Sequence, residues 1–213
     1  MKTDDLVTML ATSAGPVVPG ATARRYATAL AWGAFGSVLI MALLLGVRPD
    51  LRQAALLPMF WIKLAFPLSL AAAALAASTR LSRPGVRLGC IPVALAVPVL
   101  MVWMMAAWGL FVAAPDERVA MVVGNTWNLC PIFVAIVSVP SFIAAMWAMS
   151  GLAPTRLTLS GAAAGLLAGA IGAAAYAVHC DEMQAPFLAV WYVLGMLIPA
   201  AVGAVLGPRL LRW

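Results

Sequence analysis

The chain has 213 residues, of which 65% are hydrophobic and 9% are charged, and its mean hydropathy is +1.04. A water-soluble fold of this size needs a mostly polar surface, so this composition excludes a soluble domain. The net charge of +6 does not indicate a nucleic-acid partner, because arginines of membrane proteins gather in cytoplasmic loops. We therefore expect an integral membrane protein with no direct contact to nucleic acid.

Residues 1–25 form the longest polar segment outside the apolar blocks. No basic stretch leads directly into an apolar one here, so we expect no cleavable signal peptide. Asp4 and Asp5 fall in the first turn of a short predicted helix, where the helix dipole favours acidic side chains. Gly15-Pro16 and Pro19-Gly20 end any helix and predict a flexible tether before the first span.

The short N-terminal helix carries three apolar residues, Leu6, Met9 and Leu10, at helical spacing. The first residues of a domain are often frayed, and so short a helix is marginal on its own. An apolar stripe with nothing of its own chain to pack on also suits the groove of a partner protein. The pattern leaves two interpretations open, a frayed terminus or a docking peptide formed by Asp4, Asp5 and the stripe.

Six apolar blocks follow, each long enough to cross a hydrocarbon core of roughly 30 Å as a helix. The predicted spans cover residues 26–47, 54–78, 88–114, 129–150, 157–178 and 187–206. The expected fold class is therefore all-α, with residues 26–213 forming a bundle of six transmembrane helices. Six spans place both termini on the same side of the membrane.

Basic residues predict which side that is. With the termini inside, nine Lys and Arg residues lie in inner segments, three lie in outer loops, and Lys63 lies within a span. The inner residues are Lys2, Arg24, Arg25, Arg80, Arg83, Arg87, Arg156, Arg209 and Arg212, and the outer ones are Arg48, Arg52 and Arg118. Cytoplasmic loops of membrane proteins carry an excess of Lys and Arg, so we expect both termini in the cytoplasm.

Lys63 lies well inside the second span, between Pro58 and Pro67. A lysine there is costly in lipid, so its side chain should face the interior of the bundle. We favour a structural role in which its ammonium bonds backbone carbonyls that the prolines leave free. The alternative is a small-solute or ion transporter built around Lys63.

The fifth span contains Gly161, Gly165, Gly169 and Gly172, with alanines between them. Glycines at this spacing form a smooth face that lets a neighbouring helix approach closely. We interpret this face as a packing surface.

Two of the three cysteines border spans at the same predicted face of the membrane. Cys130 begins the fourth span from outside and Cys180 follows the end of the fifth, whereas Cys90 begins the third span near the cytoplasm. Adjacent antiparallel helices can bring two such residues within disulfide distance, and the outer face of a bacterial inner membrane is oxidising. Small apolar fillers are the alternative interpretation of both cysteines.

Polar side chains next to the two outer cysteines add candidate metal ligands. They are Asn128, His179, Asp181 and Glu182. Thiolate with imidazole suits soft or borderline metals, so transient binding of a heavy metal at Cys130 and Cys180 is a candidate, and no resident cofactor is required. No Cys-x-x-Cys motif and no pairing of nucleophile with base occurs, so we expect no catalytic residue and no enzyme.

Several runs of the sequence resemble one protein family. They are Met1-Lys2-Thr3-Asp4-Asp5-Leu6, Pro58-Met59-Phe60-Trp61-Ile62-Lys63, Asn128-Leu129-Cys130, Tyr176-Ala177-Val178-His179-Cys180, Phe187-Leu188-Ala189-Val190-Trp191-Tyr192 and Gly207-Pro208-Arg209. On these runs the chain resembles the negative regulator of sigma F family, which are bacterial inner-membrane anti-sigma factors with six spans. The resemblance covers essentially the whole chain.

The resemblance implies that the cytoplasmic segment 1–25 holds an extracytoplasmic-function sigma factor at the membrane. It also implies that the two outer cysteines, Cys130 and Cys180, are needed to release the sigma factor under heavy-metal or oxidative stress. The expected function is therefore transcription regulation by a membrane-bound anti-sigma factor with a cysteine sensor. Three resting states of the cysteine pair stay open: reduced, oxidised or bound to metal.

Overall fold

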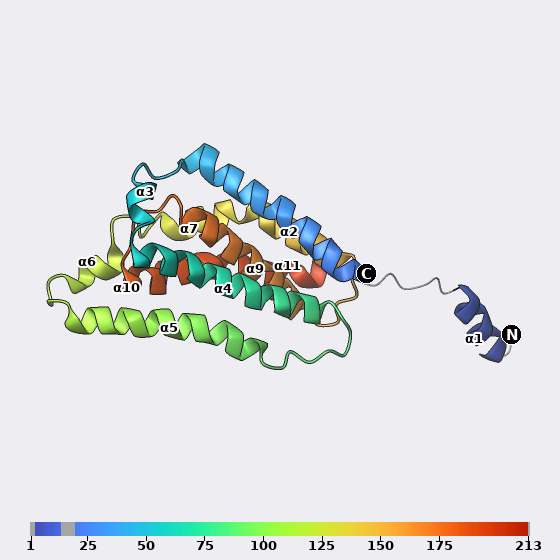
Figure 1. The fold of residues 1–213 in the computed structure, drawn as a ribbon. Helices are drawn as coiled ribbons and strands as arrows, with labels where there is room; N and C mark the ends of the chain where they lie inside the picture. Colours follow the sequence, from blue (N-terminus) through green and yellow to red (C-terminus); the bar gives the residue numbers. More distant parts are fainter. Residues whose placement is uncertain (1–2, 14–19, 213) are drawn as a thin grey trace.

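The computed structural model describes residues 3–13 and 20–212, and over these ranges all regular secondary structure is helical (Figure 1). The tether predicted at residues 14–19 lies outside the described residues. Among the described residues, five helices are long and apolar enough to cross a membrane, and a bent pair of helices makes six if the pair is one span. The all-α prediction is confirmed, and the apolar helices are compatible with a membrane protein.

Long helices make the frame of the molecule. They are α2 (Ala21–Ile40), continued by the π-helical turn η1 (Met41–Leu45), α4 (Pro58–Leu81), α5 (Ile91–Val112), α9 (Leu157–Tyr176) and α11 (Val193–Leu210). The last of these is preceded without interruption by α10 (Ala185–Phe187) and the π-helical turn η2 (Leu188–Tyr192). Two short helices, α3 (Leu51–Ala54) and α6 (Arg118–Val123), lie in the connections.

The predicted fourth span consists of two helices, α7 (Cys130–Val137) and α8 (Val139–Ser150), with a bend of 46° between them. Ser138 lies at the bend, and its hydroxyl donates to the carbonyl oxygen of Val134 at 2.8 Å. Pro140, in the first turn of α8, has no backbone N–H to continue the hydrogen bonding of α7. The sequence analysis predicted one span over residues 129–150 and did not include this bend.

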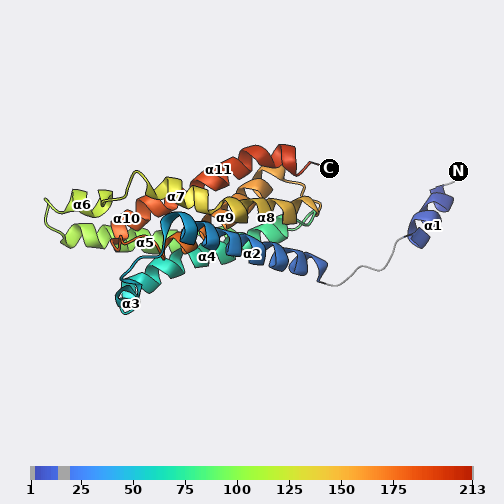
Figure 2. The same cartoon turned by 90° about the horizontal axis from the view of Figure 1, so that it is seen from above.

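Successive long helices run in alternating directions, so their connections gather at two ends of the bundle (Figure 1 and Figure 2). One end, the Cys180 end, contains α3, α6 and residues 177–184. The opposite end, the Arg83 end, contains residues 82–90 and 151–156 together with the C-terminal end of α11. These are the two ends that the sequence analysis predicts to be outside and inside, respectively.

Helix α9 is the centre of the bundle, because it packs against α2, α4, α7, α8 and α11 and most of its residues are buried. Three of its glycines, Gly161, Gly165 and Gly169, lie against the backbone of α11. The fourth, Gly172, lies against Ser138 at the bend between α7 and α8. A Cβ atom on any of the four would collide with these neighbours, so the predicted close-packing face is confirmed.

Helix α1 (Thr3–Ser13) stands apart from the bundle in both views (Figure 1 and Figure 2). Asp4 and Asp5 lie in its first turn, as predicted. Leu6, Met9 and Leu10 are 39%, 59% and 60% exposed. The apolar stripe of the N-terminal helix is therefore not buried against the long apolar helices.

Candidate functional site

Cys130 and Cys180 lie in the hydrophobic core at the Cys180 end of the bundle. Cys130 is the first residue of α7 and is completely buried, and Cys180, just beyond α9, is 3% exposed. Both are free thiols, and they lie close enough to interact with each other and with the side chain of Tyr176. Cys90 is exposed and lies at the other end, immediately before α5. The structure thus brings the two predicted partners together and separates the third cysteine from them.

Two tyrosines enclose the thiols, and the sequence analysis missed both. Tyr176 ends α9, Tyr192 lies in the π-helical turn η2, and their ring centres are 6.0 Å apart. Tyr192 is fully buried and interacts with Cys180, yet its hydroxyl has no hydrogen-bond partner among the described residues. A tyrosine in an apolar span normally needs a partner for its hydroxyl, and this requirement was the available signal.

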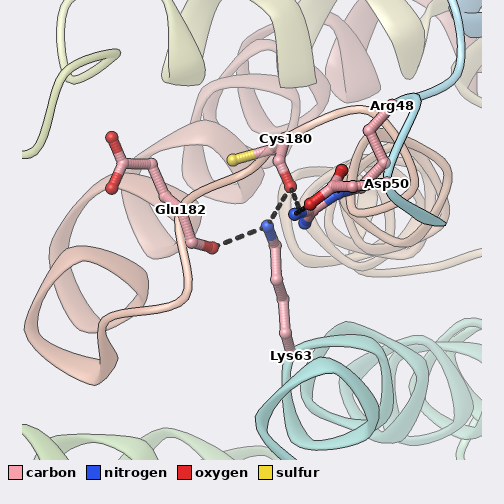
Figure 3. Close-up of polar contacts among 5 residues, drawn as sticks. All are labelled: Arg48, Asp50, Lys63, Cys180 and Glu182. Atoms are coloured by element: carbon pink, nitrogen blue, oxygen red, sulfur yellow. Dashed lines mark hydrogen bonds and ion pairs between the residues drawn. The ribbon is translucent and has the colours of Figure 1, made fainter. Parts of the chain in front are cut away.

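Lys63 reaches the same region from α4 (Figure 3). Its side chain is completely buried, and its ammonium donates to the carbonyl oxygens of Cys180 at 2.6 Å and Glu182 at 2.7 Å. The ammonium also lies 5.5 Å from the ring centre of Tyr192. A buried cation persists only when it is hydrogen-bonded, so these contacts explain how the bundle holds Lys63.

The position of Lys63 corrects one detail of the sequence analysis. Its ammonium does bond backbone carbonyls, but these belong to residues 180–182 and not to the helical turns that Pro58 and Pro67 interrupt. Because the ammonium is bonded and the side chain is sealed from solvent, the geometry favours a structural role over transport. Lys63 therefore ties α4 to the segment that carries Cys180.

A second cation bonds the same carbonyl from the connection between η1 and α3. Arg48 donates to the carbonyl oxygen of Cys180 at 3.2 Å and forms a bidentate ion pair with Asp50, with distances of 2.6 and 2.7 Å (Figure 3). The hydrogen bond from Arg48 lowers the pKa of the Asp50 carboxyl, and the same bond raises the pKa of Arg48. The carbonyl of Cys180 thus accepts hydrogen bonds from two positively charged side chains.

The four predicted neighbours of the cysteines do not gather around the thiols as a set. The Glu182 carboxylate is buried and accepts the backbone N–H of Asn125 at 2.6 Å, and the His179 ring bonds the carbonyl of Gly46 at 2.9 Å. Asp181 and Asn128 are exposed. Within residues 3–13 and 20–212, no group of three or more His, Cys, Asp and Glu side chains is arranged to hold a metal ion. Any metal at this site would be held mainly by the two thiols.

Comparison with known proteins identifies the family. The family model described as "Negative regulator of sigma F" matches residues 10–213. The chain is 54% identical over 213 residues to the "Probable anti-sigma-F factor NrsF" of Azospira oryzae, and the match covers 100% of both chains. It is 37% identical over 219 residues to the "Anti-sigma-F factor NrsF" of Caulobacter vibrioides, again over 100% of both. No solved structure matches the chain.

Two predictions are confirmed by these comparisons. The resemblance stated from the sequence runs is correct, and it extends over nearly all of the chain. The named relatives are regulators rather than catalysts, in agreement with the expectation that the chain is not an enzyme. The chain belongs to the NrsF family, the negative regulators of sigma F.

Proposed function

We propose that the chain is a multi-pass inner-membrane anti-sigma factor that binds an extracytoplasmic-function sigma factor through α1. It releases the sigma factor when Cys130 and Cys180 react with a heavy metal or an oxidant. The observation that carries the anti-sigma assignment is the full-length match to relatives named as anti-sigma-F factors. The sigma type, the docking helix and the sensor are our extensions of that assignment.

The proposal includes six spans with both termini in the cytoplasm. Basic residues support this orientation, because eight of the described ones lie at helix ends or in connections of the Arg83 end and three lie at the Cys180 end. Reporter fusions test it: residues 1–25, residues 79–87 and the C-terminus should all report from the cytoplasm. A periplasmic signal at the C-terminus would contradict both the span count and the position of the sensor.

Helix α1 is the proposed docking element for the sigma factor. It combines acidic residues in its first turn with an exposed apolar stripe, and it stands apart from the bundle. A helix of 11 residues is marginal alone, so binding in a partner's groove would stabilise it. Recognition would use the apolar stripe for affinity and Asp4 and Asp5 for orientation.

The test of α1 is capture of the sigma factor by the purified membrane protein. Leu6→Glu places a charge on the apolar stripe, which a groove can bury only at a large cost, so capture should be lost. Thr8→Glu adds the same charge on the opposite side of the helix and should leave capture intact. Equal capture by wild type and both variants would move the docking site away from α1, to the exposed loop containing Arg83 and Arg87.

The proposed sensor chemistry uses only the two buried thiols. A soft divalent cation would be bound as two thiolates after two protons leave, whereas an oxidant would take two electrons and two protons to form a disulfide. Either product joins the start of α7 to the segment after α9. Because Cys130 and Cys180 are buried, the reagent must enter by a local opening of the Cys180 end.

Lys63 offers a route from the thiols to the other end of the bundle. Its ammonium holds the carbonyl of Cys180, and its helix, α4, runs from the Cys180 end to the Arg83 end. A shift of residues 180–182 would therefore change how α4 packs in the bundle. Twentyfold release of a partner needs only about 1.8 kcal/mol of coupling between two sites, which is within the usual range.

The sensor is tested in strains carrying cysteine variants. Cys130→Ser, Cys180→Ser and the double variant should each lose sigma-dependent transcription after cadmium or chromate, because each removes half of the same bond. Cys90→Ser should respond normally, since that thiol lies at the opposite end. A normal response in either single outer variant would end the paired-sensor proposal and leave the anti-sigma assignment intact.

A further inference from the structure

A small basic cavity lies at the Arg83 end, between the loop after α4 and the turn before α9. It has a volume of about 260 Å³. Its lining includes Arg83 and Arg87 from the first segment and Thr155 and Arg156 from the second, with Leu81 from the end of α4. Among the residues that the structure describes, none of those lining it is acidic. Two segments about 70 residues apart in the chain thus contribute three arginines to the lining of one cavity.

These arginines differ from others at the same end. Arg25 donates to the carbonyl oxygens of Ala148 and Trp147, and Arg80 donates to that of Leu88. Within residues 3–13 and 20–212, the side chains of the three cavity arginines have no hydrogen bond and no ion pair. Three like charges around one cavity repel each other, and an anion bound between them would remove that repulsion.

The chemistry of the cavity fits a phosphate group. Guanidinium groups bind phosphate oxygens through paired N–H donors, and the hydroxyl of Thr155 supplies a further donor at the same wall. The volume of the cavity suits a head group and not a folded segment or a long peptide. The ligand class is therefore a small phosphate ester or free phosphate.

The position of the cavity selects the source of that phosphate. It lies where α4 ends and where α5 and α9 begin, at the boundary where a bilayer places its head groups. Val86, an apolar lining residue, is 42% exposed beside the arginines, as expected for a side chain that meets acyl chains. Basic pockets between the ends of membrane helices are suited to anionic lipid head groups.

We propose that Arg83, Arg87 and Arg156 bind the phosphate of an anionic phospholipid, which joins the α4–α5 loop to the turn before α9. This site is independent of the cysteine pair and of the sigma factor. Its function is to fix the relative positions of α4 and α9 at this end. An acidic protein segment is the competing occupant, but α1, which carries Asp4 and Asp5, stands apart from the bundle (Figure 1 and Figure 2).

The experiment uses the full-length protein in neutral detergent with phosphatidylglycerol, phosphatidylcholine or inorganic phosphate. Native mass spectrometry should show one retained phosphatidylglycerol, with phosphatidylcholine and inorganic phosphate at least about tenfold weaker. Arg156→Gln and Arg83→Gln, on different segments, should each weaken phosphatidylglycerol retention about tenfold, the loss typical of one charge-assisted contact. Arg209→Gln, an exposed arginine at the same end outside the cavity, is the matched control and should retain the lipid.

Three results would overturn the proposal. Equal losses in Arg209→Gln and Arg156→Gln would show diffuse surface charge and no site. Competition by inorganic phosphate at concentrations similar to those of the lipid would show a free-anion site. Displacement of the lipid by a peptide of residues 1–13 but not by its Asp4→Asn, Asp5→Asn form would assign the cavity to an acidic segment. Helix content by circular dichroism, unchanged in all variants, separates loss of binding from loss of fold.

Discussion

The two ends of the bundle treat their charged side chains in opposite ways. At the Cys180 end, Lys63, Arg48 and Glu182 all form hydrogen bonds within the chain, and these bonds converge on residues 180–182. At the Arg83 end, Arg25 and Arg80 bond carbonyl groups, but three further arginines surround a cavity with no partner in the described part of the chain. The bonds at the Cys180 end hold a buried chain segment, whereas the arginines around the cavity at the Arg83 end have charge available for binding.

This difference suits the two ends to different tasks. A buried residue whose carbonyl oxygen accepts hydrogen bonds from two cations is held in a defined position. A chemical change at its thiol must therefore break or strain those hydrogen bonds. Arginines without a partner at a surface are hydrated, so they lower stability little. They gain the most binding free energy when an anion from outside the chain binds to them. The Cys180 end therefore fits the proposed response to a covalent or metal-binding event, and the Arg83 end fits the proposed binding of a lipid phosphate.

The largest expected effect comes from the contact between α9 and α11, which both run from one end of the bundle to the other. A Cβ atom on Gly165 would collide with the backbone of Pro199, so Gly165→Ala forces the helices apart and should destabilise the fold by about 3 kcal/mol. Gly109→Ala is the matched control, because its Cβ would meet only the end of Met121 at 3.6 Å. In the last turn of α5 that change should be neutral or stabilising by about 0.5 kcal/mol.

Unfolding of both glycine variants in mixed detergent micelles, followed by circular dichroism, measures this difference. Equal stabilities of Gly165→Ala and Gly109→Ala would show that the close approach of α9 and α11 does not limit the stability of the bundle.

The second largest effect concerns Lys63, the buried cation that is hydrogen-bonded at the Cys180 end. Lys63→Met removes the donor to Glu182 O and should destabilise the fold by about 2 kcal/mol, the cost of a buried carbonyl left unpaired. It should also loosen residues 180–182, so that a membrane-permeant maleimide labels Cys180 faster. Arg80→Met is the control, because it removes a carbonyl bond at the other end of the same helix. Unchanged labelling of Cys180 in Lys63→Met would contradict the idea that this ammonium holds residues 180–182 in place.

Sequence patterns predicted the parts of this arrangement that depend on local periodicity. Apolar blocks predicted the long helices, and glycine spacing in α9 predicted a close neighbour, because both follow from the geometry of one helix. The inward direction of Lys63 followed from the cost of a charge in lipid. Its partners did not follow, because the carbonyls of Cys180 and Glu182 are 117 and 119 residues away along the chain. A single sequence does not specify which helices are neighbours or their register.

The sequence predicted the two cysteines of the candidate site but not the residues around them, because a single sequence does not specify which helices are neighbours. Cys130 and Cys180 border two spans, so topology alone placed them at one end. Tyr192 reaches them because the π-helical turn η2 changes the direction of side chains in that stretch, and a regular 3.6-residue period does not include such a turn. Asn128 and Asp181 were expected near the thiols from sequence proximity, yet both are exposed.

A smaller effect distinguishes bonded from unbonded arginines at the Arg83 end. Arg25 bonds two carbonyls near the C-terminal end of α8 and lies 4.4 Å from the ring centre of Trp147. Arg25→Gln should therefore lower the free energy of unfolding by about 1 kcal/mol, through lost bonds to the helix end and a lost cation–π contact. Arg24→Gln, at the exposed neighbouring position, should change it by less than about 0.5 kcal/mol. Equal effects of the two variants would indicate that this end responds only to its total charge.

The smallest effect lies in the ion pair at the edge of the Cys180 end. Asp50 is exposed, and its pKa is lowered in the folded protein by the hydrogen bond from Arg48. A carboxyl with a lowered folded-state pKa adds stability above its ordinary pKa near about 4, and this contribution is lost as the pH falls through the folded-state value. Wild type should thus melt slightly above Asp50→Asn near neutral pH, and the gap should close below about pH 4.

Asp116→Asn, in the loop after α5, is the control for the general effect of removing a carboxylate at this end. If the gap between wild type and Asp50→Asn persists unchanged down to about pH 3, the ion pair does not stabilise the fold. The bond from Arg48 to the Cys180 carbonyl would then be set by the backbone of residues 46–50 alone. If the gap closes, and Cys180 is labelled faster in Asp50→Asn than in wild type near neutral pH, the pair acts by holding Arg48 on that carbonyl, which makes the exposed carboxylate part of the support of residues 180–182.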